Sequence, residues 1–260
     1  MVMLELNGTR LAAFESGAGD PPFVFIHGFA CDHTFWEPQV ADLSRDHRCV
    51  TIDLRGRGQS PAQGPYHVTQ QADDVAGVIR TLGFGPSIIV GHSLGGLVAL
   101  LLNERHAELV HGIVAGDSPI SKNGLGAGRM VRAIRTAGNS APYASLVDSF
   151  FVDGTPETVR EHVRTVMLGC PPEVAAGMLE DTPDDRMTEL VKLADKKPFM
   201  AMWAGTALGE PTWLRDTAMY LRQEIVPETG HFFQLENPGM TNALLRAFLD
   251  DVERDPRIQR

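Results

Sequence analysis

Hydrophobic residues along this chain gather in short continuous runs, separated by longer segments of mixed polarity. Continuous apolar runs are typical of strands that are buried on both faces of a sheet. Two further apolar segments flank an Asn7-Gly8 turn, which is typical of a hairpin. Together these patterns predict eight strands, at residues 4–6, 11–14, 23–26, 49–52, 87–90, 113–115, 199–203 and 224–226.

Helical patterns lie between these strands. Apolar spacing typical of a helix covers residues 68–82 and stops at a glycine, and residues 94–105 are apolar nearly all round. A third helix is predicted over residues 238–252, with Asn237 as its N-cap. Strands that alternate with helices of this length indicate an α/β fold, with a mostly parallel sheet covered by helices on both faces.

Residues 118–197 interrupt the alternation, because no strand pattern occurs there. Several short helices are predicted instead, one of them starting where Thr155 would act as N-cap before a proline. We therefore expect residues 1–117 and 198–260 to form the core domain and residues 118–197 to be a helical lid inserted into it. The alternative is a second packing layer without a gating role.

Charge and cysteine content exclude several classes of function. The net charge of −10 argues against binding to nucleic acid or to an anionic membrane surface. Neither a signal-peptide pattern nor an apolar run of membrane-spanning length is visible, so we expect a cytoplasmic protein. Cys31, Cys49 and Cys170 lack metal-ligand spacing, which predicts buried thiols and no metal site.

The most specific signal is a serine between a buried strand and a helix. Ser93 follows the apolar run 87–90 and is flanked by Gly91 and Gly95 in a G-x-S-x-G pattern. Such a strand-turn-helix exposes a nucleophilic hydroxyl at the helix N-terminus, and the glycines allow strand and helix to pass closely. The context predicts that Ser93 is a catalytic nucleophile.

A serine hydroxyl needs a neighbouring base to become nucleophilic at neutral pH. His231 is the best candidate, because it follows the last predicted strand and so lies at the sheet edge where parallel strands build sites. His27 and His92 compete less well: we expect the first to order its own loop and the second to point away from the nucleophile.

Acyl transfer also needs hydrogen-bond donors for the oxyanion that forms. The helix that follows Ser93 offers the backbone amide of Leu94, and the loop after the strand 23–26 offers that of Phe29. Backbone donors suit this task because they are fixed before the charge develops.

Taken together, these motifs resemble those of the α/β-hydrolase family, and the resemblance extends over nearly the whole chain. The resemblance rests on His27-Gly28-Phe29 as the oxyanion loop, on the loop 53–60, on the elbow 91–96 and on Gly230-His231 as the base. It implies a mostly parallel eight-stranded sheet with a helical lid. A serine nucleophile in this family implies hydrolysis of esters, lactones, thioesters or some carbon–carbon bonds. The family's dehalogenases and epoxide hydrolases, which use aspartate there, are disfavoured.

The third member of the expected triad departs from the family pattern. Such enzymes commonly carry an aspartate a few residues beyond a glycine after the seventh strand, but residues 205–211 include none. Two carboxylates can replace it. Asp117 at the end of the sixth strand is favoured, since some family members place the acid there, and Glu210 is the alternative. The acid would hold the tautomer of His231 and offset its charge.

These residues predict a serine hydrolase that cleaves small carboxylic esters or lactones through an acyl-enzyme, without cofactor or metal. Its expected partner is the small-molecule substrate; neither the residues that bind it nor the oligomeric state is identifiable from the sequence. Two alternatives stay open. One is a carbon–carbon bond hydrolase of ring-cleavage diketones, which uses the same triad. The other is a small-molecule receptor with a vestigial triad.

Overall fold

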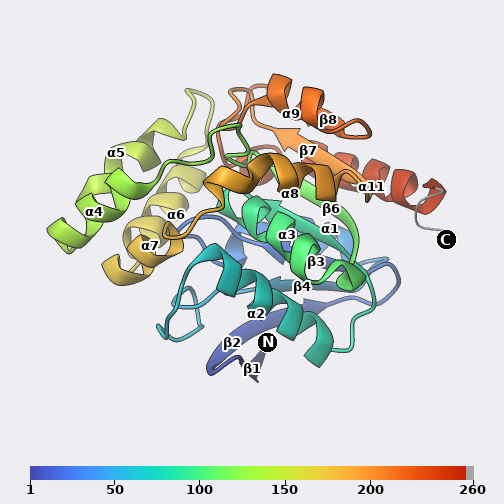
Figure 1. The fold of residues 1–260 in the computed structure, drawn as a ribbon, viewed down its shortest axis with the longest axis horizontal. Helices are drawn as coiled ribbons and strands as arrows, with labels where there is room; N and C mark the ends of the chain where they lie inside the picture. Colours follow the sequence, from blue (N-terminus) through green and yellow to red (C-terminus); the bar gives the residue numbers. More distant parts are fainter. Residues whose placement is uncertain (256–260) are drawn as a thin grey trace.

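Eight strands form one sheet in residues 1–255, the part of the chain that the computed structural model describes (Figure 1). Each predicted strand is confirmed, with ends that shift by a few residues. The strands are β1 (Val2–Leu6), β2 (Thr9–Ser16), β3 (Phe23–Ile26), β4 (Cys49–Ile52), β5 (Ser87–His92), β6 (Val110–Gly116), β7 (Phe199–Trp203) and β8 (Arg222–Ile225).

The strand order brings the ends of several strands to one edge. The order is β1-β2-β4-β3-β5-β6-β7-β8; β2 runs antiparallel to both its neighbours, and all other neighbouring strands are parallel. Gly91 of β5 pairs with Ile26 of β3 on one side and with Ala115 of β6 on the other. The carboxyl ends of these central strands therefore lie together, which is where open α/β sheets build ligand sites.

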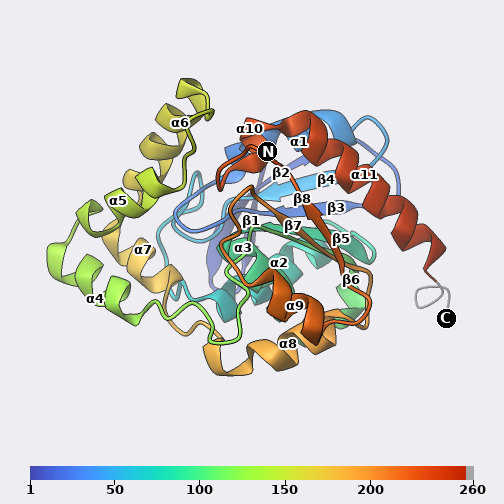
Figure 2. The ribbon, with the colours of Figure 1, turned by 90° about the horizontal axis from the view of Figure 1, so that it is seen from above.

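Alternate residues of each central strand enter two separate cores. In β3, Val24 and Ile26 face the core beneath α2 (Val68–Thr81) and α3 (Leu94–Arg105). Phe23 and Phe25 face the opposite core, beneath α1 (Glu37–Leu43) and α11 (Pro238–Arg254). Figure 2 shows the two helical layers on either side of the sheet. This period of two on a continuous apolar run is what a strand buried on both faces requires.

The three predicted helices are present. Asn237 caps α11 by accepting a hydrogen bond from the amide of Met240 at 3.2 Å, as predicted. Helix α3 is buried on almost every side, including Leu97, Leu100 and Leu101. Each such side chain contributes about 1.5–3 kcal/mol by leaving water, so α3 is held by burial rather than by an amphipathic pattern.

Residues 118–197 contain helices and no strand, as predicted. These helices are α4 (Gly128–Ala137), α5 (Ala141–Ser149), α6 (Glu157–Leu168), α7 (Pro172–Met178) and α8 (Met187–Ala194). Helices α4 to α7 project together to one side of the sheet, whereas α8 lies along α3 and shares its core (Figures 1 and 2). We call α4 to α7 the projecting unit; α8 belongs to the layer that covers the sheet.

The remaining helices of the described chain are short. They are α9 (Pro211–Thr217), α10 (Phe233–Glu236) and three single turns of 3₁₀ helix at His33–Trp36, Ala107–Leu109 and Asp184–Arg186. Within residues 1–255, no helix combines the length and the apolar character that a membrane crossing needs. The three cysteines are buried and form no disulfide.

The predicted N-cap at Thr155 is wrong. Helix α6 begins at Glu157, and Pro156 occupies the position before it. The Thr155 hydroxyl donates instead to Glu236 Oε2 at 2.9 Å and accepts from the amide of Val152 at 3.0 Å. The local sequence pattern assigned the Thr155 hydroxyl to the start of the helix, but this hydroxyl binds a carboxylate from a distant part of the chain.

Candidate active site

Ser93 occupies a sharp turn between β5 and α3. Its backbone has φ 54° and ψ −122°, a strained conformation for a residue with a side chain. A Cβ on Gly91 would lie 2.2 Å from the carbonyl oxygen of Gly95, and one on Gly95 would lie 2.4 Å from that of Ile26. The two glycines are thus required by close backbone approach, as expected from the sequence. The amide of Ser93 donates to the carbonyl of Gly116 at 2.7 Å, which fixes the turn on β6.

Asp117 and His231 form a buried hydrogen-bonded pair beside this turn. Asp117 directly follows β6, and its Oδ2 accepts from Nδ1 of His231 at 2.6 Å. Its Oδ1 accepts from the amides of Leu208 at 3.0 Å and Ala204 at 3.4 Å. The loop after β7 therefore orients the carboxylate with its backbone. With the Nδ1 proton held by Asp117, Nε2 of the neutral imidazole is left as an acceptor.

Glu210, the alternative acid, lies elsewhere. Its Oε2 accepts from the amide of Lys122 at 2.9 Å, and its own amide donates to Ile120, so it is tied to the segment that follows Asp117. Its side chain is exposed to solvent. Of the two acids that the sequence offered, only Asp117 contacts the imidazole of His231 in the described part of the chain.

His92 anchors the loop that carries His231. Its Nε2 donates to the carbonyl of His231 at 2.8 Å, and the two ring centroids lie 4.5 Å apart. Complete burial holds the pKa of His92 well below its usual range, so this ring is neutral. Because His92 precedes Ser93 in the chain, this hydrogen bond holds the histidine loop against the serine turn.

The projecting unit also holds His231, through a residue that the sequence did not identify. Phe150 lies at the end of α5, and its backbone carbonyl accepts a hydrogen bond from the amide of His231 at 2.9 Å. The phenyl ring of Phe150 stacks on the imidazole of His231, with the two ring centroids 4.3 Å apart. Glu236, which binds Thr155, also accepts from the amide of Gly230 at 2.9 Å. No local pattern marks Phe150, because it is distant from His231 in the chain.

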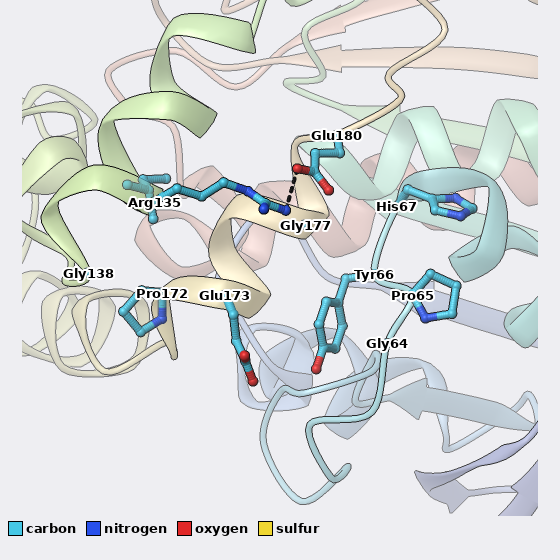
Figure 3. A pocket seen from close by; sticks show the side chains of 11 residues that line it. Gly64, Pro65, Tyr66, His67, Arg135, Gly138, Pro172, Glu173, Gly177 and Glu180 are labelled. Atoms are coloured by element: carbon cyan, nitrogen blue, oxygen red, sulfur yellow. Dashed lines mark ion pairs between the residues drawn. The ribbon is translucent and has the colours of Figure 1, made fainter.

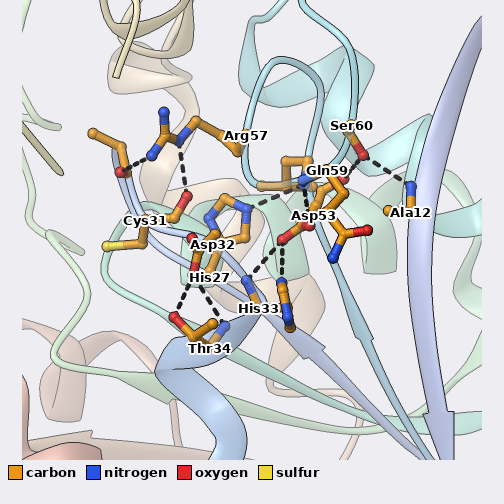
Figure 4. Close-up of polar contacts among 12 residues, drawn as sticks. Ala12, His27, Cys31, Asp32, His33, Thr34, Asp53, Arg57, Gln59 and Ser60 are labelled. Carbon is orange, nitrogen blue, oxygen red and sulfur yellow. Dashed lines mark hydrogen bonds and ion pairs between the residues drawn. The ribbon is translucent and has the colours of Figure 1, made fainter. Parts of the chain in front are cut away.

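Arg57 fixes the loop that carries Phe29 (Figure 4). Its side chain donates to the carbonyls of Ala30 at 2.7 Å and Cys31 at 2.9 Å, and also to Val166 of α6 at 3.0 Å. These hydrogen bonds from a buried guanidinium hold the loop on one side and tie it to the projecting unit on the other.

His27, which directly follows β3, also orders this loop, as expected from the sequence. Its Nε2 accepts from the amide of Leu54 at 3.1 Å, and its Nδ1 donates to the carbonyl of Gly28 at 2.9 Å. Acceptance at Nε2 requires the neutral ring, and donation from Nδ1 fixes which tautomer it is. Complete burial lowers the pKa of His27 to about 4, which agrees with that state.

A second Asp–His pair supports the neighbouring turn and lies outside the candidate site. Asp53 accepts from Nδ1 of His33 at 2.8 Å and from the amide of Gln59 at 2.8 Å (Figure 4). Partial burial lowers the pKa of His33, but the hydrogen bond and charge of Asp53 outweigh it and raise the pKa overall. Burial by itself would raise the pKa of Asp53. The hydrogen bonds that Asp53 accepts from His33 and Gln59 outweigh this effect, so the pKa of Asp53 is lowered overall.

The amides of Phe29 and Leu94 are available as donors. Leu94 is the first residue of α3, so its amide has no acceptor inside the helix. The amide of Phe29 has no hydrogen-bond acceptor within residues 1–255. Both residues line the same cavity as Ser93.

This cavity has a volume of about 310 Å³ and lies between the sheet edge and the projecting unit. Most of its walls are apolar, and the projecting unit supplies much of them, including Met130, Leu146 and Phe150. A larger cavity of about 600 Å³ lies where residues 64–67 meet α4 and α7, beside an Arg135–Glu180 ion pair of 2.5 Å (Figure 3). It is not lined by Ser93, so the smaller cavity is the candidate active site.

Across residues 1–255, no three His, Cys, Asp or Glu side chains gather in a way that could hold a metal ion. The candidate site combines a serine and two amides that line the mostly apolar cavity with a hydrogen-bonded imidazole and carboxylate that lie beside the serine turn.

A family model described as "Alpha/beta hydrolase family" matches residues 23–244 of the chain. A 2-(acetamidomethylene)succinate hydrolase from Mesorhizobium japonicum is 39% identical over 116 residues, which are 44% of this chain and 41% of that protein. The chain therefore aligns with less than half the length of this curated relative.

Two solved structures resemble the fold over nearly its full extent. A thermophilic esterase from Thermogutta terrifontis, with malate bound, has a TM-score of 0.85 at 25% identity and covers 96% of this chain and 97% of that chain. An enol-lactonase from Burkholderia xenovorans LB400 has a TM-score of 0.85 at 24% identity, with 96% and 100% covered. The second likeness is evidence for the fold alone.

Proposed function

Because the chain belongs to the alpha/beta hydrolase family, we propose that it hydrolyses small carboxylic esters or lactones through an acyl-enzyme on Ser93. One observation carries this proposal. The buried Asp117–His231 hydrogen bond of 2.6 Å lies at the same sheet edge as the Ser93 turn, with His92 joining the two segments. A serine, an imidazole and a carboxylate in this order are what nucleophilic acyl transfer needs.

In the first half of the reaction, Nε2 of His231 takes the proton of Ser93 as Oγ attacks the carbonyl carbon of the substrate. The negative charge that develops on the carbonyl oxygen accepts hydrogen bonds from the amides of Phe29 and Leu94. When this tetrahedral intermediate collapses, the carbon–oxygen bond to the alcohol breaks. The leaving oxygen takes the proton from His231, and the acyl group stays on Ser93.

The second half repeats these steps with water as the nucleophile. His231 takes a proton from water, whose oxygen attacks the acyl carbon, and the bond to Ser93 breaks with return of the proton to its oxygen. Asp117 keeps Nδ1 protonated throughout and stabilises the imidazolium that forms in each half. In a lactone the alcohol stays attached to the acyl chain, so hydrolysis releases a single hydroxy acid.

The size and polarity of the cavity support small substrates. About 310 Å³ of mostly apolar space accommodates a short acyl chain or a small ring, but not a long lipid chain. Esters are favoured over other substrates of a serine nucleophile because the solved structure that resembles this chain at 25% identity is an esterase, and a lactone presents the same acyl–oxygen bond in a ring.

Steady-state turnover tests this proposal. The purified protein and its Ser93→Ala variant would be assayed with p-nitrophenyl acetate and butyrate, with γ-butyrolactone, and with a ring-cleavage dienone. We expect linear turnover of an ester or lactone that the variant lacks. Cleavage of the dienone alone would replace the proposal with carbon–carbon hydrolysis, and one slow burst that stops would replace it with a receptor.

A further inference from the structure

The cavity beside Ser93 is lined by a single charged residue among those that the structure describes. Among the described residues that line it, Arg129 is the only one with a formal charge. The surrounding walls are formed by side chains such as Leu125, Met130 and Leu179. A neutral ester has no negative charge that could form an ion pair with this guanidinium.

Arg129 also differs from most other arginines of the insertion. Of the six arginines in residues 118–197, four donate to carboxylates or to backbone carbonyls, and these are Arg135, Arg160, Arg164 and Arg186. Arg129 and Arg132 have neither an ion pair nor a hydrogen-bond acceptor within residues 1–255. Only Arg129 of these two lines the cavity.

The local structure gives no reason for a cation at this position. Arg129 is the second residue of α4, and the residue before that helix, Ala127, provides no side-chain cap. The first turn of a helix favours acidic side chains, because the helix dipole is positive there. A residue that breaks a local rule at the wall of a cavity is expected where function selects it.

We propose that Arg129 binds a carboxylate that the substrate carries away from its scissile carbonyl group. The substrates would then be half-esters of dicarboxylic acids, or lactones with a free carboxylate. The guanidinium can receive such a group through two parallel hydrogen bonds, while the apolar walls contact the chain between the carboxylate and the reacting carbon. This inference rests on the proposed function, because it assigns Ser93 to the carbonyl at the other end of the substrate.

A matched pair of substrates tests the inference. Mono-p-nitrophenyl adipate carries the carboxylate, and p-nitrophenyl methyl adipate has the same chain with the charge removed. The kcat/KM of each would be measured for the wild type, for Arg129→Met and for Arg132→Met, which removes the same charge one turn further along α4. Spontaneous hydrolysis of each ester is subtracted with a protein-free blank.

We expect Arg129→Met to lower kcat/KM for the anionic ester by about threefold to tenfold, mainly through KM, because Arg129 is exposed to solvent and its ion pair is therefore weak. The neutral ester should change by less than about twofold, and 0.5 M salt should reduce the difference between the two substrates. Arg132→Met should behave as the wild type. Equal effects of Arg129→Met on both esters, or no effect on either, would overturn the inference.

Failure of the proposed function would look different. In that case the wild type would hydrolyse neither ester faster than Ser93→Ala does. Binding then decides the role of Arg129: calorimetry on Ser93→Ala would compare monomethyl adipate with dimethyl adipate, with and without Arg129→Met. Tighter binding of the anion that disappears in the double variant supports the inference, and equal binding of both ligands overturns it.

Discussion

Replacing Asp117 by asparagine tests the acid of the proposed triad. The substitution keeps the shape of the side chain, and its amide oxygen can still accept from Leu208, so the fold should survive. It removes the negative charge that faces His231 at a hydrogen-bond distance of 2.6 Å. The imidazolium that forms in each half of the reaction would then lose its counter-charge in a buried site.

The size of the effect follows from the geometry. Two unit charges about 4 Å apart interact by about 4 kcal/mol at an effective dielectric constant near 20. At about 1.4 kcal/mol for each factor of ten, this corresponds to a loss of about three orders of magnitude in rate. A carboxamide can also stabilise the wrong imidazole tautomer, so we expect kcat to fall by about 10³- to 10⁴-fold.

The assay is steady-state hydrolysis of p-nitrophenyl acetate by the wild type, Asp117→Asn and Glu210→Gln, with thermal melts to establish that each variant is folded. Glu210→Gln removes the same charge from the alternative acid, and it should retain the rate of the wild type because that carboxylate binds the amide of Lys122. A folded Asp117→Asn that keeps its kcat within tenfold of the wild type would refute the assignment, above all if Glu210→Gln is inactive.

Three further predictions concern the surroundings of the site. Gly91→Ala places a Cβ 2.2 Å from a backbone carbonyl oxygen, so urea unfolding should show a loss of about 3 kcal/mol or more, whereas Gly85→Ala, with open space around its Cβ, should be nearly neutral. His92→Phe removes the donor that anchors the loop of His231 and should lower kcat about tenfold, while His92→Gln restores a donor and should recover most of the rate; equal losses would contradict this role. Folding raises the pKa of His33 above its usual value of 6.5. The stabilisation that protonated His33 contributes to the folded state is therefore complete below pH 6.5, and it is lost as the pH rises through the pKa of the folded protein. Urea titrations of His33→Gln should therefore show a larger destabilisation at pH 5.5 than at pH 8.5, and a pH-independent difference would exclude the linkage.

The sheet and the serine turn could be predicted because their signals are local. Continuous apolar runs mark strands buried on both faces, and Gly91 and Gly95 mark a close backbone approach that the structure contains. The N-cap of α11 at Asn237 is local in the same way, since the side chain binds an amide three residues later.

Contacts between distant segments could not be predicted in this way. The sequence left Asp117 and Glu210 as alternative acids, because the choice depends on which loop at the sheet edge turns toward His231. Phe150 was missed since its carbonyl and ring reach the imidazole from a separate helix. Thr155 was assigned to a helix start because a proline follows it. Its actual partner, Glu236, comes from a remote segment that no local pattern identifies.

The central claim is that Ser93 is a nucleophile activated by His231. Labelling with a fluorophosphonate, followed by peptide mass spectrometry, tests it most directly because the adduct identifies the attacking oxygen. We predict a stoichiometric adduct on the peptide that contains Ser93, formed much more slowly in a folded His231→Ala variant. A folded wild type that stays unlabelled at this serine, or a His231→Ala variant labelled at the wild-type rate, would contradict it.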